Sequence, residues 1–337
     1  MNKYLKIIII AIFFLIIINL GIYYYFFNNK LIFSLNGSNT NDNGINNKKE
    51  NPLTIESLKK RSYGTGTIKI EKDLGEKKGY KSYIVSYLSD GLKLYSLLNI
   101  PSTKKTPNGF PVIIVNHGHI PPEQYSIERS YSLVTSYYAS NGFMVLKPDY
   151  RGHDKSENGN DPNTERLSYA IDVLNLLYLI PTLNDADKDN IFVYGHSMGG
   201  GVTLTVLEVA NNINAATLWA AVSIEFPESL LYFIRKRHSE EANSLLSRLE
   251  EVFTQEDFYK LSPINYLKYI TAPIIIQHGT KDDSVPIEWS DQLAEKLKNN
   301  NIYYEYYKYE NDDHNFAKGN FYKVLKKDIE FFKKYMK

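Results

Sequence analysis

The stretch that decides the fold is Ile191–Gly200, with the sequence IFVYGHSMGG. Its first four residues have the apolar pattern of a buried β-strand, and a helical pattern starts near Met198. Between them, Gly195-His196-Ser197-Met198-Gly199 matches G-x-S-x-G, in which a serine on a sharp strand-to-helix turn exposes its hydroxyl. A glycine-rich turn is the alternative interpretation of this short motif. The flanking strand and helix favour Ser197 as a nucleophile.

Strand and helix patterns alternate along the chain and predict an α/β fold. Strand patterns cover 83–87, 92–100, 111–115, 143–146, 191–194, 217–224 and 273–277, and helical spacing marks 131–140, 167–177 and 325–336. This alternation predicts a mostly parallel, twisted sheet with helices on both faces. The turn Ser89-Asp90-Gly91 predicts an antiparallel hairpin at its start. Residues 225–261 are charged and helical in pattern, and predict a small helical cap.

The N-terminal region predicts a membrane anchor and a linker. Residues 7–27 are almost entirely apolar and follow Lys3 and Lys6. A helix of this length, at about 1.5 Å per residue, crosses a hydrocarbon core of roughly 30 Å. A cleaved signal peptide is the alternative, although its apolar region usually has about 7–15 residues. We expect a single-pass signal anchor in residues 1–27 that contacts the lipid bilayer, with the rest of the chain extracytoplasmic.

The remaining chain divides into a linker and a domain. Residues 28–61 are polar and rich in Asn, which is typical of a flexible tether, and residues 62–337 form the predicted globular domain.

Composition excludes several classes of function. Lys and Arg number 39 against 38 Asp and Glu, so a net charge of +1 gives no field suited to a nucleic-acid backbone. The chain has no Cys, which excludes disulfides, thiolate zinc sites, iron-sulfur clusters and a cysteine nucleophile. We therefore expect no nucleic-acid partner.

A nucleophilic serine needs a base and a carboxylate that orients the base. His314 lies in a polar loop before the last helix, and Asp282 follows the strand pattern 273–277. The chain order Ser197, Asp282, His314 is that of α/β-hydrolases. Asp283 is a rival because it is adjacent to Asp282, and Asp313 is a weaker one.

The oxyanion hole is expected to use two backbone N–H groups, those of Met198 and His119. A metal interpretation of His117-x-His119 is disfavoured because no Asp-His pair follows, so we expect neither a metal nor a cofactor. The cap supplies candidate side chains for a substrate pocket: Phe226, Leu230, Tyr232 and Phe233.

Residues from about 80 to 337 resemble an α/β-hydrolase, specifically the catalytic domain of the prolyl oligopeptidase (S9) family and related bacterial esterases. The motifs that carry the likeness are Asn116-His117-Gly118, Asp149-Tyr150-Arg151-Gly152, Gly195–Gly200, Ser262–Tyr266, His278–Asp282 with Val285-Pro286, and Asp313–Phe316. The resemblance implies a serine hydrolase that cleaves a small-molecule or peptide acyl substrate through an acyl-enzyme.

The family's oligopeptidases carry a β-propeller before the catalytic domain, and this sequence has no counterpart to it. We therefore expect an esterase before an S9-type peptidase. An acyltransferase on the same fold is a further alternative, and a catalytically silent binding module is the least favoured.

Overall fold

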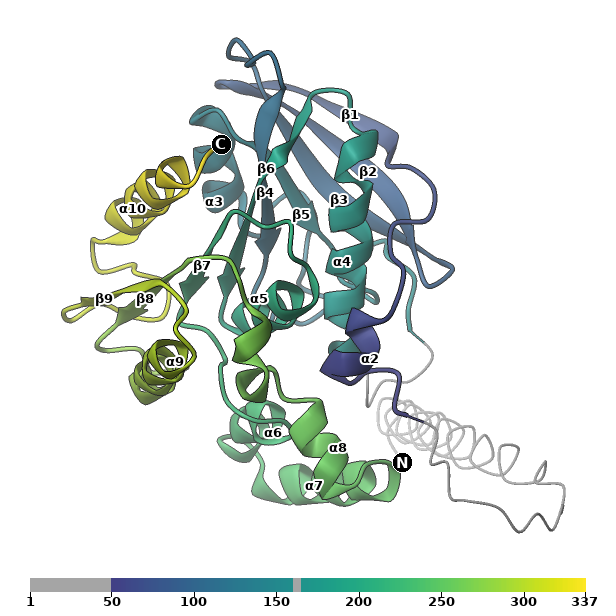
Figure 1. The fold of residues 1–337 in the computed structure, drawn as a ribbon, viewed down its shortest axis with the longest axis vertical. Coiled ribbons are helices and arrows are strands. Elements are labelled where there is room, and N and C mark those ends of the chain that lie inside the picture. Colours follow the sequence, from purple (N-terminus) through teal and green to yellow (C-terminus); the bar gives the residue numbers. More distant parts are fainter. Residues whose placement is uncertain (1–49, 160–164) are drawn as a thin grey trace, which may run out of the picture. The chain divides into compact units, whose positions relative to one another are not determined.

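A twisted nine-stranded sheet runs through residues 50–159 and 165–337, which are the residues that the computed structural model describes (Figure 1). The strand order is β1-β2-β3-β5-β4-β6-β7-β8-β9. The strands are β1 Lys69–Lys77, β2 Tyr80–Ser89, β3 Leu92–Pro101, β4 Phe110–Asn116, β5 Met144–Pro148, β6 Ala186–His196, β7 Ala215–Trp219, β8 Ile274–Gly279 and β9 Tyr304–Tyr309.

The sheet is antiparallel at one end and parallel over the rest. Neighbours from β1 to β3 pair antiparallel, as does β3 with β5. All neighbours from β5 to β9 pair parallel. The predicted α/β fold, with a mostly parallel sheet and an antiparallel hairpin at its start, is confirmed.

Two edge strands were not predicted. Strand β1 has the sequence KIEKDLGEK and is exposed along most of its length, so it lacks a buried apolar face. Strand β9, YEYYKY, has four tyrosines and two charged residues and is mostly half-buried. Edge strands contact the core on one side, and their apolar signal is correspondingly weak.

Helices cover both faces of the sheet. One face packs against α4 Tyr169–Leu179, α5 Met198–Val209 and α9 Ile287–Asn299, and the other against α3 Ser132–Ser140 and α10 Phe321–Lys334. Strand β4 shows why: Ile114 faces the first group and Ile113 the second, and both are fully buried. Successive side chains of a strand point to opposite faces, so a continuous apolar run fits a sheet buried on both sides.

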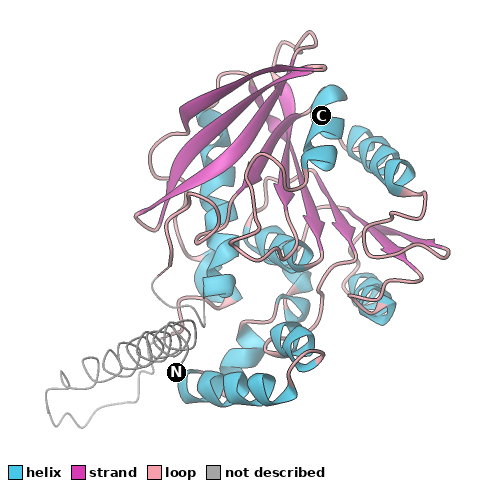
Figure 2. Cartoon of the chain, turned by 180° about the vertical axis from the view of Figure 1, so that it is seen from behind, coloured by secondary structure: helices cyan, strands magenta, loops and turns pink. Residues whose placement is uncertain are grey.

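Three helices occupy the range predicted as a cap: α6 Glu228–Arg235, α7 Ser239–Val252 and α8 Gln255–Lys260. Figure 2 shows them beyond the ends of the parallel strands. They enclose their own apolar cluster, in which Leu231, Leu249 and Phe258 are buried. The cap therefore has a core separate from the two that flank the sheet.

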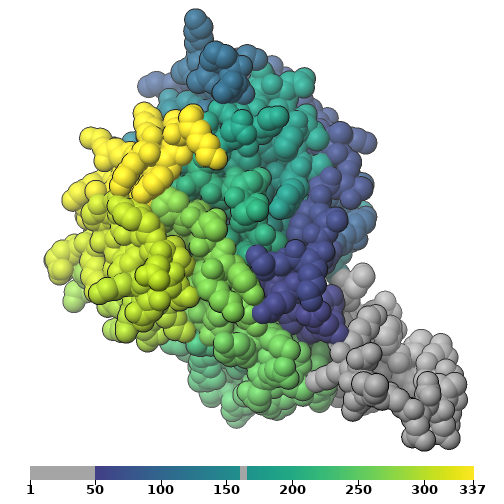
Figure 3. Space-filling view, in the orientation of Figure 1, coloured from purple at the N-terminus to yellow at the C-terminus, as the bar shows by residue number. Residues whose placement is uncertain are grey.

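A short helix, α2 Ile55–Lys59, lies in the range predicted as linker. Ile55 and Leu58 are each 1% exposed, and the ammonium group of Lys59 donates to the carbonyl of Glu208 on α5 at 3.0 Å. The compact unit accordingly begins at Glu50 and not at the predicted boundary of 62. In Figure 3 this segment, in purple, lies on the surface beside the green cap.

The predicted anchor, residues 7–27, lies outside the described residues. Among residues 50–159 and 165–337, no helix has both the length and the apolar character needed to cross a membrane.

Candidate active site

Ser197 occupies a strained turn between β6 and α5. Its backbone has φ 56° and ψ −122°, a conformation that L-residues rarely adopt and that is often found at functional sites. The turn is held on both sides: Ser197 N–H donates to the carbonyl of Trp219 at 2.9 Å, and its carbonyl accepts from Gly200 and Val222 at 2.9 Å each. The strand-to-helix turn that the G-x-S-x-G motif predicts is present.

The loop after β4 approaches this turn closely, and glycines permit the approach. A Cβ atom on Gly199 would lie 2.2 Å from the carbonyl oxygen of Asn116, closer than real atoms pack. A Cβ on Gly118 would lie 3.1 Å from the Cβ of Ser197. The loop that carries His119 is therefore fixed beside the serine.

The two residues expected to form the oxyanion hole both line the same cavity as Ser197. In residues 50–159 and 165–337, neither the Met198 amide nor the His119 amide donates a hydrogen bond to the protein. The amide of Gly118, the residue before His119, already has an acceptor, since it donates to the hydroxyl of Tyr131 at 2.8 Å. Two unused donors therefore remain near the serine, as an oxyanion hole requires.

The structure brings His314 to Asp282 and not to either rival carboxylate. His314 Nδ1 lies 2.7 Å from Oδ2 of Asp282. Asp283 accepts from the hydroxyl of Ser284 at 3.2 Å, and Asp313 accepts from backbone amides of its own loop, those of Asn315 and Ala317. Within the described chain, only Asp282 is placed to fix the ring of His314.

Asp282 is surrounded by hydrogen-bond donors. Its Oδ1 accepts from the amides of Ser284 and Val285 at 2.8 and 2.9 Å, and its Oδ2 lies 3.0 Å from Nε2 of His278. Burial acts to raise the pKa of this carboxyl, but the hydrogen bonds from His278 and His314 outweigh it and hold the pKa below its usual range. Asp282 is therefore ionised beside the His314 ring.

A chain of hydrogen bonds connects the loop after β4, which carries Gly118 and His119 and is called the oxyanion loop here, with the loop that carries His314. Tyr131 accepts from Gly118 N–H and lies 2.5 Å from Nδ1 of His196. His196 Nε2 in turn lies 3.0 Å from the carbonyl oxygen of His314. Burial, followed by the proximity of His314, lowers the pKa of His196 to about 3, so the ring is neutral and donates through Nε2. Sequence analysis gave Tyr131 no role, because its contacts are all distant in the chain.

Ser197 and His314 lie on the wall of one cavity. No hydrogen bond connects the serine hydroxyl with the imidazole among the described residues. In hydrolases this contact often shortens only when substrate binds.

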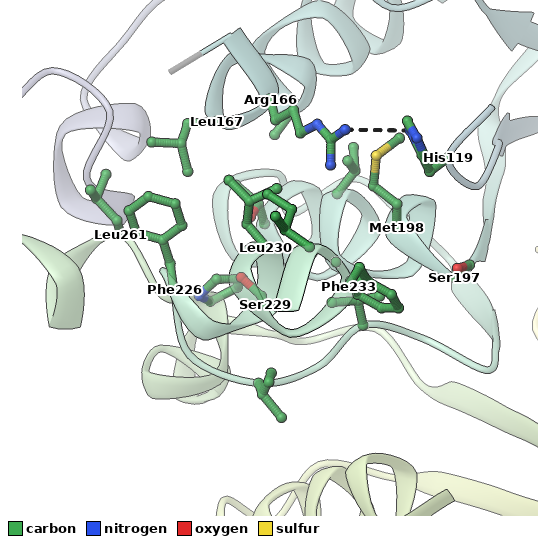
Figure 4. Close-up of a pocket in the computed structure, with 18 of the residues that line it drawn as sticks. His119, Arg166, Leu167, Ser197, Met198, Phe226, Ser229, Leu230, Phe233 and Leu261 are labelled. Carbon is green, nitrogen blue, oxygen red and sulfur yellow. Dashed lines mark hydrogen bonds between the residues drawn. The ribbon is translucent and has the colours of Figure 1, made fainter. Parts of the chain in front are cut away.

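The cavity has a volume of about 510 Å³ and extends from Ser197 under the cap (Figure 4). Three of the four predicted pocket residues, Phe226, Leu230 and Phe233, line it. Tyr232 does not: its ring packs against Trp289, with centroids 4.9 Å apart. The difference follows from helical spacing, because residues three apart share a face of α6 and Tyr232 points elsewhere.

Other parts of the wall were missed by sequence analysis. Leu53, Ile55 and Leu58, from the range predicted as linker, line the far end. Arg166 belongs to a short 3₁₀ helix, Glu165–Ser168, and its Nη2 lies 3.5 Å from Nδ1 of His119 (Figure 4). No motif surrounds Arg166, so only the tertiary structure shows it facing the cavity. Burial, followed by Arg166, lowers the pKa of His119 to about 4 and keeps that ring neutral.

Comparisons with known proteins agree with this geometry. Residues 129–337 match the sequence profile of the prolyl oligopeptidase family. The chain is 29% identical over 223 residues to the uncharacterized peptidase YtmA of Bacillus subtilis, covering 64% of this chain and 79% of the relative. It is 26% identical over 197 residues to human protein ABHD12B, covering 57% of this chain and 51% of the relative.

Solved structures share the fold. An acetyl xylan esterase from Paenibacillus sp. R4 superposes with a TM-score of 0.63 at 18% identity, covering 84% of this chain and 92% of the other. The acylaminoacyl peptidase of Pyrococcus horikoshii gives a TM-score of 0.60 at 21% identity, covering 77% of this chain and 42% of the other. At these identities the likeness establishes the α/β-hydrolase fold alone.

Proposed function

This chain belongs to the prolyl oligopeptidase family of serine hydrolases, and from that premise we propose that it cleaves esters, in preference to amides, through a covalent intermediate on Ser197. The observation that carries the proposal is the cavity that places Ser197 and His314 on one wall, with His314 Nδ1 2.7 Å from an ionised Asp282. This is the arrangement of nucleophile, base and orienting carboxylate that acyl transfer needs.

The reaction proceeds in two halves. Ser197 Oγ attacks the substrate carbonyl while His314 Nε2 takes its proton, and the Met198 and His119 amides stabilise the oxyanion. The tetrahedral intermediate collapses as the protonated His314 gives its proton to the leaving oxygen or nitrogen. Water then attacks the acyl-enzyme, giving its proton to His314, and the acid is released as Ser197 recovers its hydrogen. Asp282 keeps Nδ1–H in place throughout.

The charges around the cavity favour an ester substrate over the amino end of a peptide. Three cationic residues line the cavity: Arg166, Lys236 and Arg237. Among the described lining residues, Asp283 is the single carboxylate. These cations therefore repel a protonated peptide amino terminus. An uncharged acyl chain is not repelled, and it can pack against apolar lining residues such as Leu230 and Phe233.

Turnover of a matched pair of substrates tests the proposal. We expect the full chain to hydrolyse a 4-nitrophenyl ester and to leave the 4-nitroanilide of the same acyl group intact, and the Ser197→Ala variant to do neither. Cleavage of both substrates by the unaltered chain would identify a peptidase. Failure of Ser197 to react with a fluorophosphonate probe would contradict the hydrolase mechanism. Adding an alcohol and analysing the products separates hydrolysis from acyl transfer.

We also propose that residues 7–27 tether the protein to a membrane, with the catalytic domain on the extracytoplasmic side. The support is the apolar sequence and the Lys residues before it. The full chain is expected to stay in membranes washed with alkaline carbonate, and a variant without residues 7–27 to leave them. Digestion of the domain by protease added outside intact cells tests its side.

A further inference from the structure

Of the three cations on the cavity wall, Lys236 has an acceptor on the protein, whereas neither Arg166 nor Arg237 pairs with a carboxylate of the described residues. Lys236 donates to the carbonyl oxygen of Asp283 at 2.8 Å. The contact of Arg166 with a neutral His119 is long, at 3.5 Å. Within residues 50–159 and 165–337, no carboxylate pairs with the Arg166 guanidinium. Its hydrogen-bonding capacity is therefore left for something that enters the cavity.

The Arg166 side chain is exposed to the open cavity, and apolar side chains lie beside its guanidinium. Figure 4 shows the guanidinium beside Met198, with Leu167 and Leu230 nearby. Burial lowers the pKa of Arg166, and the neighbouring Arg237 lowers it further. A guanidinium that faces an open cavity close to a like charge attracts an anion that enters the cavity. A carboxylate suits a guanidinium because the two can form paired hydrogen bonds.

The position of Arg166 also restricts the shape of the ligand. Figure 4 places it between the catalytic end of the cavity, marked by Ser197 and His119, and the apolar end, marked by Phe226 and Leu261. An acyl chain attached at Ser197 passes Arg166 before it reaches the residues of α2. A ligand that fills the cavity therefore has an apolar carbon chain, and a negatively charged group on that chain can reach Arg166.

We propose that Arg166 binds a carboxylate carried on the acyl chain of the substrate, so that the preferred substrates are esters of apolar acids that bear a second, anionic group. This inference rests on the proposed hydrolase function, which supplies the acyl attachment at Ser197. The Arg166 side chain selects the substrate and takes no part in bond cleavage.

Two matched esters test the selection. 4-Nitrophenyl octanoate and 4-nitrophenyl hydrogen suberate have acyl chains of the same length, and only the second ends in a carboxylate. We expect the full chain to prefer the suberate ester at least about tenfold in kcat/KM, because only this ester gains a charge-assisted hydrogen bond to the guanidinium. Arg166→Met should abolish this preference, and Arg166→Lys should keep part of it.

Arg248→Met is the matched control, because it removes the same charge from an exposed site on α7 that does not line the cavity. It should retain the preference. The proposal is overturned if the unaltered chain prefers the octanoate ester. It is also overturned if a preference for the suberate ester survives Arg166→Met.

A binding measurement keeps this inference separate from the proposed reaction. The Ser197→Ala variant, which cannot turn over substrate, should bind monomethyl suberate, and adding Arg166→Met should weaken the Kd at least about tenfold. If neither ester is hydrolysed but this loss of binding is observed, the proposed reaction fails and the anion site stands. If the esters are hydrolysed and Kd does not change, the anion site fails alone.

Discussion

His314 Nδ1 donates to Oδ2 of Asp282 across 2.7 Å, and the carboxylate that receives it is also bound by two backbone amides and by His278. Four donors around one buried carboxylate keep it charged and immobile. The imidazole is therefore held in one tautomer, with Nε2 free to accept the serine proton.

Replacing Asp282 with Asn should lower kcat about 10³- to 10⁴-fold, because the amide no longer fixes the tautomer of His314. Asp283→Asn is the control, since that carboxylate contacts Ser284 and not the imidazole. Steady-state kinetics of both variants, with thermal unfolding to verify folding, make the measurement. An equal or larger loss of kcat in Asp283→Asn would mean that Asp283, and not Asp282, orients His314.

Removing the hydroxyl of Tyr131 should impair catalysis without touching the serine or its base. Tyr131→Phe leaves the Gly118 amide without its acceptor and disconnects His196 from the oxyanion loop. We expect kcat to fall about tenfold, less than the 10²–10³ typical for losing a direct oxyanion donor. Tyr137→Phe, on the helix that follows Tyr131, alters a hydroxyl with no hydrogen bond in the described chain and should be near neutral. Equal kinetics for the two variants would refute the connection.

Phe233 should set the preference for long acyl chains. Phe233→Ala removes apolar wall from the cavity. Each methylene of the acyl chain that is no longer buried costs about 0.8 kcal/mol, so kcat/KM for an octanoyl ester should fall several-fold relative to an acetyl ester. Tyr232→Ala is the comparison, because Tyr232 packs on Trp289 outside the cavity. Its ratio of octanoyl to acetyl activity should stay unchanged. A shift of similar size in both variants would show that general loosening of the cap is the cause.

Asp328, a fully buried residue of α10, should make stability depend on pH. Burial raises its pKa to about 7, although Thr217, Tyr138, Trp219 and Gln277 all donate to it. An unfolded Asp titrates near 3.9. Between these values the folded state keeps a proton that the unfolded state loses, so this contribution is complete below about pH 4 and disappears as the pH rises through 7.

Urea unfolding of the wild type and Asp328→Asn at several pH values measures this effect. The difference in unfolding free energy between the two should shrink as the pH rises from 4 to 7, by up to about 1.4 kcal/mol per pH unit. A difference that stays constant over that range would mean that Asp328 is ionised in the folded protein as it is in the unfolded one.

Local sequence signals were sufficient for the central strands and for the turn at Ser197, because a buried parallel strand and a glycine-rich turn are both recognisable within about ten residues. Chain order then suggested Asp282 and His314, which the structure places in contact. Arg151, in the Asp149–Gly152 motif, instead forms a buried ion pair with Asp172 on α4 at 2.5 Å, which is a structural contact.

What sequence could not supply depends on contacts between distant segments. Helix α2 has only five residues, and its two buried side chains become significant only once α5 lies beneath them. Tyr131 and Arg166 are ordinary residues in sequence, and each acts through a partner on another element. The edge strands β1 and β9 are mostly exposed or half-buried, so neither has the buried apolar run that marks the central strands.

The wall contributed by Leu53, Ile55 and Leu58 means that reaction and selectivity are encoded in separable stretches of the chain. The proposed nucleophile, base and oxyanion donors follow the ends of sheet strands, whereas the far end of the cavity comes from the segment before the sheet and from the cap. Exchanging residues 50–61 or the cap with those of a relative should therefore change the preferred length of the acyl chain and leave the reaction itself unchanged. Evolution and protein engineering can vary this recognition in modules while leaving the catalytic apparatus in place.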